Sequence, residues 1–326
     1  MPKAGCRVLR ATFAVWSNRK ELLPSFPLKA EVPSLLTDFK SVDPIPCPVS
    51  PDGTIFIEDR PGRPTARLAG RRASFRGPFR RLAREASDAR FGFWGNQGFL
   101  YRFALRLLEE RHGVFSLHAA GLVDERGPVL YVVIGGAGSG KTVFLLSGLA
   151  RGLKLFSTET VHFRPSSSGR LRWDKGSVID NVRLGTLVHD FPDFRPPNVA
   201  KSGAKDLWTK KIALDLGAFA STEDVLVDPD LVLLFPRVEA GRRSHIRRPV
   251  GDPRTAAKAF FDNMSQKIGE SFLLYDRLAL PGQDTSDLAA ARLRAAKRLA
   301  RHPSVRLTAS VLAGPERCWG DLVDKI

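Results

Sequence analysis

The spacing of apolar side chains along the middle of the chain predicts alternating helices and strands. Residues 99–108 carry apolar side chains at helical spacing, and the expected helix ends near Gly113. The segments 114–123 and 129–134 are strongly apolar and are expected to form strands. Only the polar turn 124–127 separates them, which predicts an antiparallel hairpin.

Shorter segments extend this pattern toward the end of the chain. A helix is expected at 142–150, with Gly152 as its stop signal. Further strands are expected at 153–157, 161–164 and 231–235, with β-like pieces at 171–173 and 177–179. Residues 181–222 alternate helix-like and loop pieces, and helices are expected at 255–263 and 288–301. This order of elements predicts an α/β fold with a mixed sheet.

The beginning of the chain has a different composition. Prolines recur from residue 24 to residue 51, so residues 1–54 are expected to be irregular. A strand is predicted at 54–58, and a short helix is predicted to start near Pro78. Arginines are dense in the segment 60–90, with few acidic residues to balance them.

Composition narrows the class of protein. The chain has 326 residues with 43% hydrophobic and 26% charged residues, which is typical of a folded protein. Its net charge of +17 favours polyanionic partners, namely nucleic acid, anionic lipid or acidic protein, although a general bias toward arginine gives the same charge without a partner. Three widely spaced cysteines predict neither a zinc site nor a disulfide framework. Without a secretory pattern or a long apolar run, the sequence predicts a cytoplasmic protein with no membrane span.

A phosphate-binding loop follows the second predicted strand. The pattern GxxxxGK[ST] is matched in full by Gly135, Gly136, Ala137, Gly138, Ser139, Gly140, Lys141 and Thr142. Glycines allow consecutive backbone N–H groups to surround a phosphate, and the start of a helix adds its positive end. Lys141 is expected to reach the β- and γ-phosphates, and the Thr142 hydroxyl is expected to bind Mg²⁺. The motif therefore predicts binding of ATP with Mg²⁺.

Several classes of phosphate-loop protein are disfavoured. A GTPase is expected to carry an NKxD-type base-reading motif, and the sequence has none. Residues 146–148 read Leu-Ser-Gly, as in the signature of transporter-type ATPases, but they lie in the helix after the loop, where that signature cannot act. The loop alone does not name the reaction.

The surroundings of the loop resemble the catalytic domain of HPr kinase/phosphorylase, a bacterial protein-serine kinase whose nucleotide fold is related to phosphoenolpyruvate carboxykinase. A strand that carries His118 precedes the loop strand, the helix after the loop ends at Arg151-Gly152, and the next strand runs into Thr158-Glu159. The family has a similar RGH-x-LxxDD stretch at the last of these places. The resemblance is close over about residues 114–164 and weaker over 165–326. The long N-terminal region is more similar to the smaller relatives of this kinase, such as peptide-modifying kinases.

The resemblance implies an HPr-kinase-like, ATP-binding catalytic domain at 91–326 after a variable region at 1–90. It also implies a kinase that transfers the γ-phosphoryl group to a hydroxyl, and a homo-oligomer. Paired aspartates supply the base and assist the metal in the family, where this chain has Thr158 and Glu159. Glu159 is therefore the expected base and a Mg²⁺ ligand. Asp180 is a candidate for the second carboxylate.

Other charged residues are candidates for stabilising the transferring group. The resemblance places His118 facing the phosphates, where an imidazole can donate a hydrogen bond, although a histidine on a strand is also common as a core residue. One additional cation is expected to clamp phosphate. Its candidates are Lys210, Lys211, Arg237, Arg242, Arg243, Arg247 and Arg248.

Three functions stay open at this point. The first is a kinase acting through Glu159, His118 and Lys141 on an acidic protein, a peptide or a small hydroxyl compound. The second is a nucleotide-regulated nucleic-acid-binding protein, which the arginine density favours, although no recognised nucleic-acid-binding motif is present. The third is an ATP-binding protein without phosphotransfer, because Thr158 stands where the family has an acid.

Overall fold

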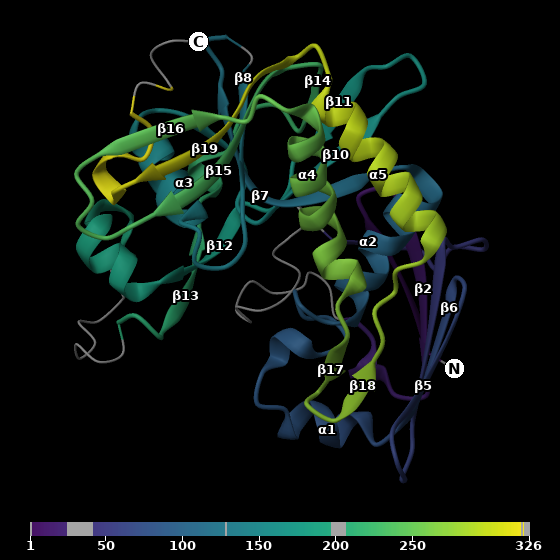
Figure 1. Cartoon of the computed structure of the whole chain (residues 1–326). Helices are drawn as coiled ribbons and strands as arrows, with labels where there is room; N and C mark the ends of the chain where they lie inside the picture. The colour runs from purple at the N-terminus through teal and green to yellow at the C-terminus, as the bar shows by residue number, and fades with distance from the viewer. Residues whose placement is uncertain (1, 25–41, 128, 197–206, 321, 323–326) are drawn as a thin grey trace. The chain divides into compact units, whose positions relative to one another are not determined.

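The computed structural model describes residues 2–24, 42–127, 129–196, 207–320 and 322. The chain divides into two compact units, which are described separately here (Figure 1). Unit 1 consists of Met1–Phe115 and Met264–Arg292, and unit 2 consists of Ser116–Asn263 and Leu293–Ile326. The chain leaves unit 1 after Phe115 and returns to it at Met264, so unit 1 is made of two separate segments. The sequence predicts a single boundary at residue 90.

Unit 1 is built on a six-stranded sheet with the order β3-β1-β2-β4-β6-β5. The two central pairings, β2–β4 and β4–β6, are parallel, and the outer pairings are antiparallel. The elements of unit 1 are β1 (Lys3–Val8), β2 (Ala11–Ser17), η1 (Lys20–Leu22), β3 (Val42–Ile45), β4 (Gly53–Asp59), β5 (Thr65–Ala69), β6 (Arg72–Gly77), α1 (Phe79–Glu85), η2 (Ala89–Phe91), α2 (Phe99–His112), β17 (Phe272–Leu274) and β18 (Leu278–Leu280). Aromatic rings from α2 and the sheet, among them Phe13, Phe75 and Phe103, fill its core.

The prediction that residues 1–54 are irregular is wrong for β1, β2 and β3. The prolines that motivated it begin at residue 24, after β1 and β2 have ended. Most side chains of β2 are buried against the core of unit 1, and tertiary burial of this kind favours a strand. The strand predicted at 54–58 and the helix predicted near Pro78 are confirmed as β4 and α1.

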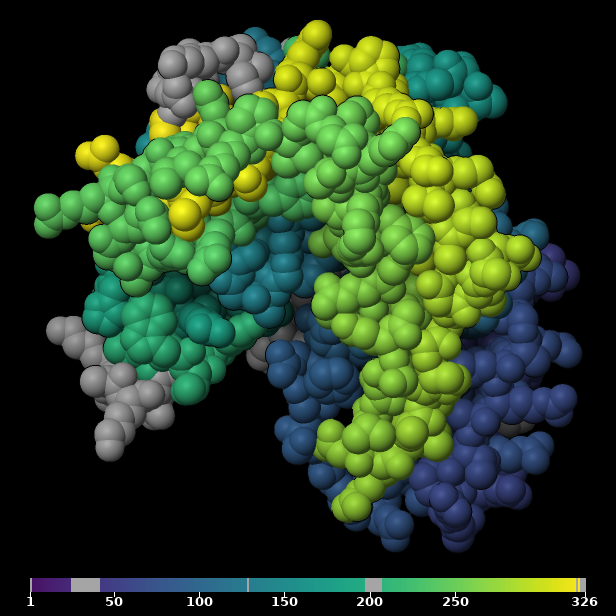
Figure 2. All heavy atoms as spheres, viewed as in Figure 1, coloured from purple at the N-terminus to yellow at the C-terminus, as the bar shows by residue number. Residues whose placement is uncertain are grey.

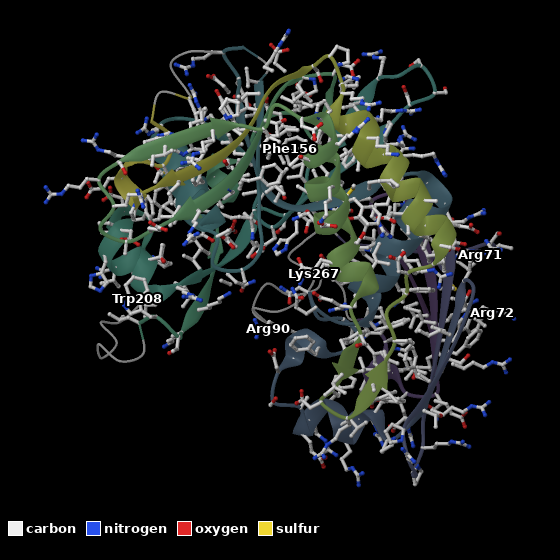
Figure 3. All side chains as sticks on the ribbon, in the orientation of Figure 1. Arg71, Arg72, Arg90, Phe156, Trp208 and Lys267 are labelled. Carbon is white, nitrogen blue, oxygen red and sulfur yellow. The ribbon has the colours of Figure 1, made fainter. Side chains whose placement is uncertain are left out.

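The arginine-rich segment 60–90 includes the antiparallel pair β5 and β6. Along β6 the side chains alternate, so that Ala73 and Phe75 are buried while Arg72 and Arg76 are exposed. Arg71 and Arg72 lie on the outside of the unit 1 ribbon (Figure 3). These arginines therefore belong to the solvent-facing side of a strand whose other side packs into the core.

Unit 2 is built on a nine-stranded mixed sheet with the order β14-β11-β10-β7-β8-β15-β19-β16, and β9 pairs with β7. Its elements are β7 (Phe115–Asp124), β8 (Val129–Ile134), α3 (Lys141–Ala150), β9 (Lys154–Ser157), β10 (Thr160–Pro165), β11 (Leu171–Asp174), β12 (Ile179–Arg183), η3 (Thr186–Asp190), η4 (Pro192–Phe194), β13 (Lys211–Asp215), η5 (Gly217–Phe219), β14 (Val225–Val227), β15 (Asp230–Val238), β16 (His245–Pro249), β19 (Val305–Ala313) and η6 (Pro315–Arg317). The helices α4 (Pro253–Gly269) and α5 (Ser286–Ala300) contribute residues to both units.

The centre of the unit 2 sheet explains the apolar character of β8. It pairs with β7 in antiparallel register and with β15 in parallel register, so both of its edges are hydrogen bonded. Every residue of β8 is buried, as expected for a strand covered on both faces. Trp319 also packs on this region, because its ring contacts Tyr131 and its Nε1–H donates to Phe144 O at 2.9 Å. The C-terminal segment thus anchors α3 beside the sheet.

The α/β class with a mixed sheet is confirmed, as are the β7–β8 hairpin and the helices predicted at 99–108, 142–150, 255–263 and 288–301. Two details differ. The strand expected at 177–179 begins only at Ile179 and continues to Arg183, and the stretch 181–222 contains the strand β13, with which it pairs. The apolar residues of β13 form a run of only three, Ile212 to Leu214, which is too short to stand out in the sequence. Among the described helices, none is both long enough and apolar enough to cross a bilayer.

Candidate active site

The segment 135–140 joins the end of β8 directly to the start of α3. Gly138 and Gly140 have φ angles of 80° and 100°, a left-handed conformation that glycine adopts without a steric penalty. A Cβ on Gly140 would lie 2.3 Å from Val238 Cγ2, so space as well as conformation requires glycine there. The Val238 N–H donates to Ser139 O at 3.1 Å. The end of β15 therefore holds the loop in place.

Lys141 lies at the first position of α3 and is largely buried. Its Nζ donates to the carbonyl oxygens of Gly135 at 2.7 Å and Gly136 at 3.4 Å. The ammonium group is therefore held against the curved backbone of the loop. Its positive charge favours the ionised form of the two carboxyl groups described next, Glu159 and Asp180, although burial still raises the pKa of Asp180.

Thr142, the following residue, contacts the first strand of the small β12–β13 pair. Its Oγ1 donates to Asp180 Oδ2 at 3.3 Å. Asp180 is only 1% exposed and lies at the second position of β12. From the sequence, Asp180 is a candidate for the second carboxylate, because Thr158 cannot supply one. In the structure it contacts the Thr142 hydroxyl, which is expected to bind Mg²⁺.

Glu159 meets His118 and Asp180 at the same place. Glu159 lies in the turn between β9 and β10, and its Oε2 is 3.4 Å from His118 Nε2. Its carboxyl group is also hydrogen bonded to that of Asp180. The backbone fixes this arrangement, because the Ala119 N–H donates to Glu159 O at 3.0 Å. The two residues predicted to be catalytic, His118 and Glu159, thus lie side by side.

The two carboxyl groups have opposite pKa shifts. Burial, and then the neighbouring charge of Glu159, raise the pKa of Asp180 to about 8. Burial alone would raise the pKa of Glu159 as well, but the hydrogen bond from His118 and the charge of Lys141 outweigh it and lower the pKa to about 2. Near neutral pH Glu159 is therefore ionised and Asp180 is protonated, so the pair carries one negative charge.

Thr158 has a structural role in this arrangement. Its Oγ1 donates to Ile179 O at 2.8 Å and contacts Ser177 O at 3.3 Å, while its N–H donates to Ser177 O at 3.0 Å. Asp180 follows Ile179, so Thr158 ties the turn that carries Glu159 to the strand that carries Asp180. The chain thus has a hydroxyl anchor where the resembled family has an acid, and it presents its second carboxylate from β12.

Sequence reasoning missed Asn263, which holds the backbone of His118 from both sides. Asn263 Oδ1 accepts from the His118 N–H at 2.8 Å, and its Nδ2 donates to His118 O at 3.2 Å. Asn263 lies on α4, more than a hundred residues after His118. No motif links the two positions, so only the fold could identify this contact.

The candidates for an additional phosphate clamp are less closely associated with the site. Arg237 and Arg242 both form ion pairs with Glu239, at 3.0 Å and 2.7 Å. Glu239 follows Val238, whose N–H donates to Ser139 O, so the backbone that carries these arginines passes beside the loop. The other candidates are exposed residues of β13, β16 and their flanking turns: Lys210, Lys211, Arg243, Arg247 and Arg248. The clamp stays a prediction.

The donor atoms suit a magnesium ion bound together with a nucleotide. Mg²⁺ prefers oxygen ligands and is commonly held by one or two carboxylates together with substrate phosphates. The Thr142 hydroxyl and the Asp180 and Glu159 carboxyl groups provide such oxygens beside the loop. Within the described parts of the chain, no cluster of three or more histidine, cysteine or acidic residues forms a metal cage.

Comparison with known proteins leaves the family open. Neither the protein-family models nor the curated proteins contain a match to this chain. The likeness to HPr kinase/phosphorylase stays a prediction from the motifs of this chain.

Proposed function

We propose that unit 2 is an HPr-kinase-like phosphotransferase that binds Mg·ATP and transfers the γ-phosphoryl group to a hydroxyl, preferably a serine of an acidic protein or peptide. One observation carries the proposal: Asp180 of β12 contacts Thr142 at the start of α3, and Glu159, from the turn between β9 and β10, contacts Asp180 and His118. A loop that only bound nucleotide would need Lys141 and Thr142, but not a charged carboxylate held by His118.

The residues have separate roles in the proposed reaction. Lys141 and the loop N–H groups would hold the β- and γ-phosphates. Thr142 and Asp180 would hold Mg²⁺, and Asp180 would give up its proton when the ion binds. The ion would supply positive charge to the phosphate oxygens. His118 keeps the Glu159 carboxylate in one orientation, with 3.4 Å between Nε2 and Oε2. The ionised Glu159 is then available to accept a hydrogen bond from the acceptor hydroxyl.

The transfer itself is a single displacement. The acceptor oxygen forms a bond to the γ-phosphorus while the bond between that phosphorus and the β–γ bridging oxygen breaks, and its electrons leave with ADP. The hydroxyl proton passes to Glu159. A pKa of about 2 makes Glu159 a weak base, which suits a loose transition state that needs orientation more than early deprotonation.

The test uses the full chain, Mg·ATP labelled at the γ-phosphate, and a panel of synthetic acidic peptides that contain serine. Lys141→Ala should lose binding of a fluorescent ATP analogue. Glu159→Gln should retain that binding but transfer phosphate about a hundredfold more slowly. Glu223→Gln, an exposed glutamate of unit 2, serves as the control and should behave as wild type. Wild-type transfer rates in Glu159→Gln would show that the base is assigned wrongly.

The same experiment separates the proposal from an ATP-binding protein without phosphotransfer. Such a protein would bind the analogue, lose binding on Lys141→Ala, and form neither ADP nor phosphopeptide. The proposal requires phosphopeptide formation by the wild-type chain, its loss in Lys141→Ala and its slowing by about a hundredfold in Glu159→Gln.

A further inference from the structure

A groove lies between the first half of α4 and the last half of α5, entirely within unit 2. Its volume is about 490 Å³, which is large enough for several side chains of a ligand. In the space-filling view α4 and α5 form adjacent ridges on the same face (Figure 2). None of the residues that line the groove belongs to the phosphate-loop site described above. It is therefore a separate feature of the unit.

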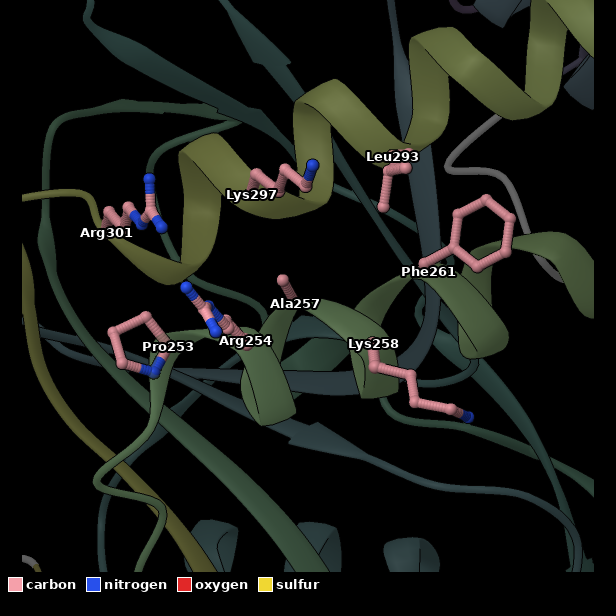
Figure 4. Close-up of a pocket in the computed structure, with 8 residues that line it drawn as sticks. All are labelled: Pro253, Arg254, Ala257, Lys258, Phe261, Leu293, Lys297 and Arg301. Atoms are coloured by element: carbon pink, nitrogen blue, oxygen red, sulfur yellow. The ribbon is translucent and has the colours of Figure 1, made fainter.

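The charged side chains that line the groove are all cationic. They are Arg254 and Lys258 from α4, Lys297 from α5, and Arg301, which directly follows the last residue of α5. Figure 4 shows Arg254 directed toward α5, while the amine of Lys258 extends away from it. The acidic side chains close to these cations already bind groups of α4.

Two acidic residues of α4 and its cap lie close to these cations. Asp262 forms an ion pair with Lys258 on the outer side of α4. Asp252 caps the helix, where its side chain accepts the N–H groups of Arg254 and Thr255 at 3.0 and 3.2 Å. Neither acid is among the residues that line the groove. The groove therefore favours an anionic ligand.

The space between the cations is apolar. Ala257 points from α4 toward α5, and Leu293 points from α5 toward α4 (Figure 4). Leu293 is 38% exposed although it lies between two helices, and Phe261 is partly exposed beside it. An exposed leucine with a neighbouring aromatic ring is a suitable anchor site for an apolar side chain of a partner. A phosphate backbone alone would leave these apolar surfaces in water.

The helix that forms one wall of the groove also holds the candidate active site. Phe260 packs on Phe235 of β15, with 5.8 Å between the ring centroids, and Asn263 holds the backbone of His118. Residues 257, 258 and 261 lie on the neighbouring face of the same helix, which faces the groove. A ligand in the groove would therefore contact the element that supports His118 without touching the reacting groups.

We infer that this groove docks an acidic peptide segment with an apolar anchor residue, belonging to the protein that receives the phosphoryl group. The identification of this segment as part of the acceptor rests on the proposed function. Recognition combines three cations, Arg254, Lys297 and Arg301, which pair with Asp or Glu side chains, and the Leu293 and Phe261 surface, which takes the apolar anchor. The segment is thereby held away from the hydroxyl that reacts.

The experiment measures fluorescence anisotropy of a labelled peptide built of Asp, Glu and Leu, with the full chain and no nucleotide. A second peptide has every Leu replaced by Ser, and a single-stranded oligonucleotide of similar length is the third probe. Lys297→Glu and Leu293→Ala should each weaken binding of the first peptide about tenfold at physiological salt. Lys141→Ala should leave it unchanged, so that loss of phosphotransfer and loss of docking are observed separately.

Two control variants make the same kinds of substitution, a cation to Glu and a Leu to Ala, at positions outside the groove. Arg243→Glu changes an exposed cation of the β15–β16 turn, and Leu273→Ala removes a leucine that is 52% exposed on β17. Both should retain wild-type affinity for the peptide. The inference fails if Arg243→Glu weakens binding as much as Lys297→Glu, if the Ser-substituted peptide binds equally well, or if the oligonucleotide binds more tightly and is lost in the groove variants.

Discussion

Replacing Thr158 with valine tests whether this residue anchors the second carboxylate. Valine has the same shape but lacks the donor, so the variant removes the hydrogen bond to Ile179 O and leaves packing intact. Thr158 is 2% exposed, and water cannot replace the lost donor there. Ile179 O keeps a weaker contact, from Ser177 Oγ at 3.3 Å. We therefore expect the free energy of unfolding to fall by about 1–2 kcal/mol.

Relative to wild type, Thr158→Val should lose more of its rate of phosphoryl transfer than of its free energy of unfolding. Asp180 follows Ile179 directly, and its carboxyl group contacts both Thr142 and Glu159. A small displacement of this backbone moves all of these contacts, so we expect the turnover of Thr158→Val to fall about tenfold. Urea unfolding gives the first quantity, and transfer of labelled phosphate to a serine peptide gives the second. Thr158→Ser keeps the hydroxyl and should restore both.

A control and an opposing variant sharpen this test. Thr222→Val removes an exposed hydroxyl and should change the free energy of unfolding by less than about 0.5 kcal/mol. Thr158→Asp restores the acid of the resembled family but places a third carboxyl group beside Glu159 and Asp180, so it should destabilise the fold without raising turnover. Faster transfer by Thr158→Asp, or wild-type behaviour of Thr158→Val, would refute this account of Thr158.

Three further predictions concern other parts of the molecule. Gly140→Ala should lower the free energy of unfolding by about 2–4 kcal/mol and weaken ATP-analogue binding, because a Cβ there requires a φ of 100° and overlaps Val238. In the wild type, Asp180 keeps its proton in the folded chain up to its raised pKa of about 8, whereas the same residue is ionised in the unfolded chain above about pH 4. The free energy of unfolding of the wild type should therefore fall as pH rises between 5 and 8, by at most about 1.4 kcal/mol per pH unit. Asp180→Asn should flatten this pH dependence. Arg292→Met should destabilise unit 1 by about 3–5 kcal/mol, because it leaves the buried Glu109 carboxyl without its partner at 2.9 Å, whereas Glu109→Gln should cost less. Urea unfolding, repeated across pH for the second variant, measures all three.

Each of these variants has a control at a nearby position. Gly136→Ala adds a Cβ that meets nothing within 4 Å and should leave the fold as stable as wild type. Asp215→Asn changes an exposed acid of β13 and should keep the wild-type pH dependence. Arg294→Met removes an exposed arginine of α5, two residues after Arg292, and should change stability little. Equal losses in a variant and its control would contradict the reason given for that variant.

Local features of this chain could be predicted because their causes are local. The phosphate loop is a contiguous motif, and the hairpin that precedes it joins two apolar strands through a short polar turn. The helix α2 has regular apolar spacing and ends at Gly113, whose φ is 60°. The resemblance pointed to His118 and Glu159, which lie side by side in the structure. His118 lies on β7, the first strand of the hairpin, and Glu159 lies in the short turn between β9 and β10.

The predicted phosphate loop, the strand and the helix on either side of it, and the α/β class all follow from residues that are neighbours along the chain. Other features depend on residues that are distant in the sequence and meet only in the folded chain. Burial against the core of unit 1 made strands of β1 and β2, and parallel pairing joined β8 to β15 and β15 to β19. Folding also brought Asp180 to Thr142 and Asn263 to His118, because hydrogen bonds between side chains far apart in sequence form only where the backbone has already placed them.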